Sequence, residues 1–122
     1  MKIIGAPNIS VEELFQKIIQ IIPLGWSHPE ITCVRIKLED QEFKSTKFSE
    51  TKWKLSSPIK YYNNKMGKLE IYYTEERPFR EIGPFSLSEK KLISKIAAKL
   101  GHILDMKYLY QMLEESEQKF QV

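Results

Sequence analysis

Hydrophobic and polar positions along the chain follow two different periods, and the first is helical. Apolar residues recur at spacings of three and four on one face of residues 11–22: Val11, Leu14, Phe15, Ile18, Ile19 and Ile22. Ser10 and Glu13 form a capping-box pattern, because each side chain can accept a hydrogen bond from an unpaired backbone N–H of the first turn. Pro23 and Gly25 then end the pattern. We therefore predict an amphipathic helix over residues 11–22.

From Ile31 the period changes to two, which is typical of strands. One face of the first predicted strand carries Thr32, Val34, Ile36 and Leu38, and the other carries Cys33, Arg35 and Lys37. Residues 39–41 indicate a turn, and residues 42–48 a second, weaker strand. Residues 52–55 alternate between charged and bulky side chains and indicate a third strand-like run.

A hairpin is predicted over residues 60–73. Residues 59–62 and 68–73 are strand-like, and residues 63–67 between them tolerate positive φ. Connections this short do not permit parallel crossovers, so we expect a mostly antiparallel sheet.

A second capping box, formed by Ser86 and Glu89, opens the last helical pattern. Apolar residues then follow at helical spacing: Leu92, Ile93, Ile96, Ala97, Leu100, Ile103 and Leu104. No proline follows up to Val122, so we predict one helix much longer than the ~8–20 residues usual in globular proteins. The fold class predicted is α+β, with a mostly antiparallel sheet flanked by an N-terminal helix and a long C-terminal helix.

The far end of this helix has the pattern of a coiled coil. Ile103, Met106, Tyr110, Leu113 and Phe120 fit the a and d positions of a heptad, and Glu117 is a polar interruption. We predict a homodimer whose seam contains Ile103, Met106, Tyr110 and Leu113. The N-terminal helix is expected to contribute Ile18, Ile19 or Ile22 to a four-helix contact.

Composition narrows the class of protein further. The chain has 122 residues and a mass of 14.4 kDa, with 42% apolar and 29% charged residues, as expected for one soluble globular domain. The net charge of +3 is too small and too dispersed to predict nucleic-acid binding. No apolar run approaches ~18 residues, so no membrane insertion is expected. The single cysteine excludes an intramolecular disulfide and favours a cytoplasmic location.

Several segments together resemble a GAF domain. Residues 55–59, the Asn-rich turn and residues 66–73 resemble the last hairpin of that family, and residues 84–89 and 92–97 resemble its continuation into a helix. Residues 22–36 look like the variant found in sensor histidine kinases. The resemblance covers roughly residues 10–110.

The segment Leu113–Phe120 is similar to the linker that leads into a PAS domain in multi-sensor kinases. The resemblance implies a GAF-like domain over residues 1–110 and a helical linker over residues 111–122, followed by a PAS-like domain. It implies a non-catalytic sensory or signal-relay domain of a two-component sensor histidine kinase, with neighbouring signalling domains as partners. Ligand-binding GAF domains carry a long insertion between central strands, whereas residues 40–53 here are short for roofing a pocket.

The candidate ligand-binding residues are Cys33, Arg35, Trp53, Tyr62 and Tyr72. Arg35 shares a strand face with Cys33, and its positive charge would lower the pKa of the thiol and make it reactive. The alternative is that Cys33 is buried and serves only as a small apolar side chain in the packing. The aromatic residues would offer a stacking surface for a ligand; the alternative is cross-strand packing.

No pattern in the chain predicts catalysis. His28 and His102 lack Cys or acidic residues at metal-ligand spacing, and no nucleophile stands beside a base. We therefore expect no enzymatic activity, no metal and no cofactor. Two other hypotheses stay open: a stand-alone dimerisation or protein-interaction module, and a regulatory appendage of a phosphoenolpyruvate-utilising phosphotransfer enzyme.

Overall fold

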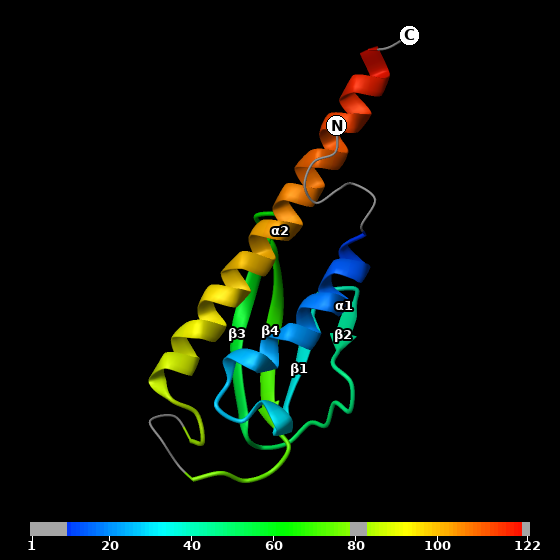
Figure 1. The fold of residues 1–122 in the computed structure, drawn as a ribbon. Coiled ribbons are helices and arrows are strands. Elements are labelled where there is room, and N and C mark those ends of the chain that lie inside the picture. The colour runs from blue at the N-terminus through cyan, green and yellow to red at the C-terminus, as the bar shows by residue number, and fades with distance from the viewer. Residues whose placement is uncertain (1–9, 79–82, 121–122) are drawn as a thin grey trace.

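The computed structural model describes residues 10–78 and 83–120, with side chains up to Glu114. One antiparallel sheet of four strands carries both helices on the same face, which we call the inner face (Figure 1). The predicted α+β class is thereby confirmed. The elements in chain order are α1 (Val11–Ile21), β1 (Thr32–Lys37), β2 (Glu42–Lys44), β3 (Lys54–Tyr61), β4 (Lys65–Tyr73) and α2 (Leu87–Phe120).

Helix α1 begins at the predicted capping box. The Glu13 N–H donates to Ser10 Oγ at 3.1 Å, and the Ser10 N–H donates to Glu13 Oε1 at 3.3 Å. The helix ends one residue earlier than predicted, because Ile22 already belongs to a 3₁₀ turn, Ile22–Gly25, that contains Pro23. A second 3₁₀ turn, Pro29–Ile31, leads directly into β1.

The strand order β2-β1-β4-β3 places β4 in the centre, paired with β1 from far earlier in the chain. Two strand predictions need correction. β2 ends at Lys44 rather than residue 48: the Ser45 N–H still donates to the Val34 carbonyl oxygen of β1, but Lys47 adopts a positive φ of 60° and turns the chain away from the sheet. β3 is one continuous strand through Pro58 rather than two short runs.

Pro58 fits in β3 because β3 is an edge strand and has only one hydrogen-bonded neighbour. Proline lacks the N–H that a central strand needs on both sides, so in sheets it is confined to such edges. Lys54 and Lys60 flank it on the same face of the strand, and both are exposed. This edge of the sheet is therefore polar and interrupted.

The hairpin between β3 and β4 is confirmed, but its turn lies earlier than predicted. Positive φ occurs at Tyr62 (53°) and Asn63 (66°), while Gly67 lies inside β4. Gly67 is needed for another reason: a Cβ there would stand 2.5 Å from the Lys37 carbonyl oxygen of β1.

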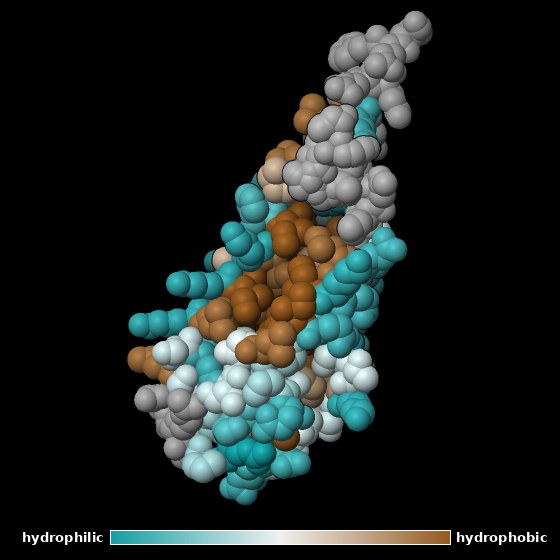
Figure 2. Space-filling model, viewed as in Figure 1, coloured by the Kyte–Doolittle hydropathy of each residue, from teal (hydrophilic) through white to brown (hydrophobic). Residues whose placement is uncertain are grey.

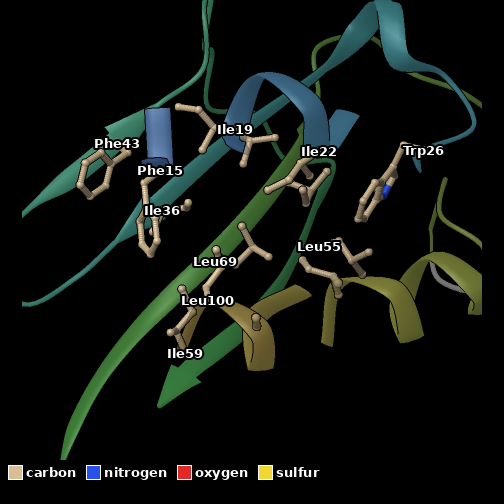
Figure 3. Packing of buried hydrophobic residues seen from close by; sticks show 14 of the residues in the cluster. Phe15, Ile19, Ile22, Trp26, Ile36, Phe43, Leu55, Ile59, Leu69 and Leu100 are labelled. Carbon is tan, nitrogen blue, oxygen red and sulfur yellow. The ribbon is translucent and has the colours of Figure 1, made fainter. Parts of the chain in front are cut away.

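The hydrophobic core lies between the sheet and the two helices, and Figure 3 shows part of it. Ile19 and Ile22 are buried in this core, so of the three α1 residues expected at a dimer contact only Ile18 is partly exposed. Other core residues come from all the main elements: Phe15, Val34, Ile36, Phe43, Leu55, Ile59, Leu69, Ile71, Ile93, Ala97, Leu100 and Leu104.

Helix α2 is a single helix of 34 residues, as its pattern predicted. The Ser86 N–H donates to Glu89 Oε1 at 2.8 Å and the Glu89 N–H donates to Ser86 Oγ at 3.1 Å, which confirms the second capping box. Its first half packs over β3, and its second half projects beyond the sheet (Figure 1).

Candidate functional site

Three of the five candidate ligand-binding residues meet on the outer face of the sheet, opposite the helices. The pairing of β1 with β4 sets Cys33 opposite Tyr72, and Arg35 opposite Glu70. Trp53 and Tyr62 lie elsewhere: Trp53 packs against the core, and Tyr62 lies in the β3–β4 turn. The five residues therefore do not form one site.

Arg35 is the centre of a buried polar network. Its Nε donates to Glu70 Oε1 at 2.6 Å, and its Nη2 donates to Tyr72 Oη at 3.1 Å. The Tyr72 hydroxyl in turn donates to Glu70 Oε1 at 3.2 Å. The three side chains thus satisfy one another, which offsets part of the cost of burying a charge pair.

Residues 48–50, between β2 and β3, lie over the outer face and complete the burial of this network. The Phe48 ring meets the Tyr72 ring edge-on at 5.3 Å between centroids, and the Arg35 guanidinium carbon lies 5.1 Å from the Phe48 centroid. Glu50 and Glu42 approach Arg35 Nη1 at 3.5 and 3.9 Å. Only 8% of Arg35 is exposed, and its charge faces carboxylates of the same chain. We call Arg35, Glu70, Tyr72, Phe48 and Glu50 the Arg35 cluster.

The pKa values of the cluster follow from burial and charge. Burial, and then the negative charge of Glu70, raise the pKa of the Tyr72 phenol to about 12. For Glu70, burial alone would raise the carboxyl pKa, but the hydrogen bond and charge of Arg35 together outweigh it and hold that pKa below its ordinary value. The cluster is therefore ionised at neutral pH at Arg35 and Glu70 and neutral at Tyr72.

Cys33 lies beside this cluster but is not activated by it. Its thiol donates to the Ser49 carbonyl oxygen at 3.4 Å, and the Ser49 N–H donates back to Cys33 Sγ at 3.5 Å. Burial raises the pKa of the Cys33 thiol, against the lowering expected from Arg35, whose charge is held by Glu70. The geometry fits the packing alternative for this cysteine.

The predicted dimer residues form a stripe along α2 that begins on the domain and continues beyond the sheet. Ile103 is partly buried and packs against the core, and Tyr110 is partly exposed. Met106 and Leu113 are 52% and 59% exposed. We call these four residues the α2 stripe.

Helix α1 carries a matching apolar stripe beside α2. Val11, Leu14 and Ile18 are partly buried, and Ile21 at the helix end is 62% exposed. On α2, Leu92, Ile96 and Ile103 are likewise partly buried and packed against the core. Figure 2 shows apolar side chains gathered between the two helices. The helical layer therefore presents a continuous apolar surface.

An open cavity of about 470 Å³ lies at the start of α2, lined by Gly25, Trp26, Ser27, Ser86, Leu87, Ser88 and Glu89. The buried Glu89 carboxylate accepts hydrogen bonds from the Ser27 N–H and Oγ, both at 2.7 Å, as well as from the Ser86 N–H. Glu89 thus ties the loop after α1 to the first turn of α2. The Trp26 Nε1 is buried with no hydrogen-bond partner among the described residues, and its atom is closed off from solvent.

The two histidines lie in different surroundings. His28 packs edge-on against Tyr73 at 5.5 Å between centroids, and His102 is exposed on α2. Among residues 10–78 and 83–120, no three His, Cys, Asp or Glu side chains are grouped closely enough to hold a metal ion. Within the same ranges, no helix is both long and apolar enough to cross a membrane.

Comparisons of the chain with family models, with curated proteins and with solved structures found no match. The resemblance to GAF domains therefore stays a prediction from the residues quoted above.

Sequence reasoning missed the partners that define these sites. Glu70, Phe48 and Glu50 surround Arg35, and Asp105 contacts the hairpin. One signal was present for Glu70: it is an acid between apolar Leu69 and Ile71, on the strand face that also carries Tyr72. Pairing it with Arg35 required the register between β1 and β4.

Proposed function

We propose that this chain is a non-catalytic dimerisation and signal-relay module, as the resemblance to GAF domains of sensor histidine kinases implies. One observation carries the proposal: the α2 stripe continues at spacings of three and four past the end of the sheet, where Met106 and Leu113 are more than half exposed. A monomer rarely leaves such a continuous apolar stripe in water.

The size of the stripe predicts a modest affinity. A half-exposed apolar side chain gains roughly 1 kcal/mol on full burial. Met106 and Leu113, the two half-exposed residues of the stripe, then contribute on the order of 4 kcal/mol from two chains, at the low end of the ~4–15 kcal/mol that association costs. A stable dimer therefore also needs the α1 stripe, which supports a contact made by both helices.

The way in which α2 is held supports the relay part of the proposal. Its first half packs on β3, so a change in the sheet alters the position of the helix, and its second half carries that change away from the domain. Such a relay requires two packing states of similar free energy, each favoured by a different input. A dimeric seam would pass a rotation of α2 to a following domain.

The test is a charge insertion into the stripe. In the Tyr110→Glu/Leu113→Glu variant, a dimer seam would contain four like charges, so we expect a folded monomer by light scattering and circular dichroism. Ala98→Glu/Gln111→Glu is the matched control, because both residues are exposed and the variant adds the same two charges to each chain away from the stripe. A parent chain that is monomeric at high micromolar concentration contradicts the proposal, as does a control that dissociates equally.

The same stripe also supports a stand-alone dimerisation module, which would associate without relaying a signal. The relay module and the stand-alone module predict different behaviour of an engineered fusion protein. In this fusion, an output domain with a measurable activity is joined after Val122, and one residue is inserted after Glu114 to rotate the end of α2. If the insertion changes the activity of the output domain, relay is supported. No change for any insertion supports the stand-alone alternative.

A further inference from the structure

The tip of the β3–β4 hairpin is fastened directly to α2. The Tyr62 N–H donates to Asp105 Oδ1 at 2.7 Å, across 43 positions of sequence. The bond uses a backbone donor in a tight turn and a carboxylate, a pairing stronger than one between neutral groups. The turn and the helix therefore meet through a specific contact as well as through apolar packing.

Two further contacts hold the same junction. The Tyr62 and Tyr108 rings lie 5.0 Å apart between centroids. Gly101 brings the helix so close to β3 that a Cβ at this position would stand 2.3 Å from the Lys60 carbonyl oxygen. Three successive turns of α2 thus touch the last residues of β3 and the turn that follows.

The turn adopts a backbone conformation that its residues rarely take. Tyr62 has a φ of 53° and Asn63 of 66°. Asparagine tolerates positive φ, but a bulky tyrosine seldom adopts it. Residues held in this way persist only where surrounding contacts fix them. Tyr62 is held by the Tyr61 ring of β3 and by Asp105 and Tyr108 of α2. Since two of these three contacts come from α2, the conformation of the turn depends on the position of that helix.

The junction lies where α2 leaves the domain. Leu104, just before Asp105, is buried in the core, while Met106, just after it, is half exposed. The hairpin tip is therefore the last part of the sheet that α2 touches before its projecting half begins (Figure 1). A contact at this point has the greatest influence on the direction of the projecting half.

We propose that the hairpin tip, residues 61–65, is the clamp through which the sheet sets the rotation of the projecting half of α2, with Asp105 as the positioning residue. The proposal rests on the relay function above and identifies the element that would regulate it. Input that moves β3 or β4 reaches α2 at Tyr62, and release of the Tyr62–Asp105 bond frees the helix to rotate.

The clamp is testable in a Cys33→Ala background, which removes the native thiol, with spin labels at Lys65→Cys in the hairpin tip and Glu114→Cys on the projecting half of α2; both positions are exposed. Labelled protein is diluted into an excess of unlabelled protein, so that only distances within one chain are measured. Asp105→Ala should broaden the distance distribution and speed amide exchange at Tyr62 about 10- to 100-fold, as loss of a charged hydrogen bond predicts. Asp105→Asn keeps Oδ1 as acceptor and should restore most of the narrow distribution.

His102→Ala is the matched control, because it removes an exposed side chain from the same stretch of α2. Unchanged distance width and Tyr62 exchange in Asp105→Ala overturn the clamp, as does equal broadening in the control. If Asp105→Ala does not fold, Tyr108→Ala removes only the ring contact, and an unchanged distribution there overturns the proposal. A monomeric parent contradicts the dimeric relay but leaves this intrachain measurement valid, so the two failures are distinguishable.

Discussion

Replacing Arg35 by methionine should destabilise the fold strongly, because it leaves Glu70 buried without its close cation. The Glu70 side chain is 3% exposed, and its remaining cation, Lys54 Nζ, lies 3.9 Å from Oε2 and is itself partly in solvent. Methionine keeps the apolar length of the arginine side chain, so the change isolates the charge and its hydrogen bonds.

The magnitude follows from the contacts that are lost. Breaking a buried ion pair by removing one partner costs ~3–5 kcal/mol. Loss of the guanidinium over the Phe48 ring adds about 0.5–1 kcal/mol. Typical domain stabilities are ~5–15 kcal/mol, so Arg35→Met should be folded but marginal at pH 7.

The pH dependence should change sign. In the parent the Glu70 pKa is lowered, so its contribution is complete above the ordinary value of 4.5 and is lost as pH falls through the lower folded pKa. Without Arg35, burial becomes the dominant influence and raises the Glu70 pKa above 4.5. The penalty in Arg35→Met is then largest at neutral pH and shrinks as the carboxyl gains a proton, so the variant should become more stable from pH 7 to pH 5.

Urea unfolding at pH 7 and pH 5, followed by circular dichroism and tryptophan fluorescence, measures both effects. The control is Arg35→Met/Glu70→Leu, which replaces both charges by apolar groups and should recover most of the loss. The reasoning is refuted if Arg35→Met costs less than ~1 kcal/mol at pH 7, or if the double variant is as unstable as the sum of the single changes.

Two further predictions concern Gly101 and Tyr72. Gly101→Ala should lower the melting temperature in a calorimetric scan, at a cost of ~1–3 kcal/mol in unfolding free energy, because its Cβ would meet the Lys60 carbonyl oxygen. The control is Ser94→Ala at an exposed position of the same helix, which should leave the stability unchanged or raise it. A Gly101→Ala variant that is more stable than the parent would contradict the close contact. In an ultraviolet titration the Tyr72 phenol should ionise near pH 12, and this ionisation step should be absent in Tyr72→Phe. Since the folded pKa of Tyr72 is raised, the parent should lose stability as the pH rises from 10 to 12. Ionisation of all tyrosines near pH 10 in the folded protein would refute the burial argument.

The helices could be predicted from the sequence because their signals are local. Ser10 with Glu13 and Ser86 with Glu89 lie within one turn of each other, so each capping box is visible without knowledge of the fold. The period of two likewise identified β1 and β4, since one face of each strand contacts the core.

The features missed depend on contacts between distant segments. The sequence predicts separate strand-like runs at residues 52–55 and 59–62, and only the position of β3 at the sheet edge shows why one strand continues through Pro58. Gly67 was predicted to lie in the turn because glycine tolerates positive φ, but it lies within β4. A glycine is needed there because the β1 backbone passes too close to leave room for a side chain. The sequence predicts that Arg35 meets a ligand or the Cys33 thiol, whereas the β1–β4 register brings its charge to Glu70 and residues 48–50 cover the pair.

The two edges of the sheet have a consequence for how the protein behaves at high concentration. A free strand edge is a template on which other chains add strands and begin to aggregate. Here one edge is β2, only three residues long, and the other is β3, which carries Pro58 between Lys54 and Lys60. Strand addition is disfavoured at both, so growth into fibrils is suppressed while the helical layer stays free to associate.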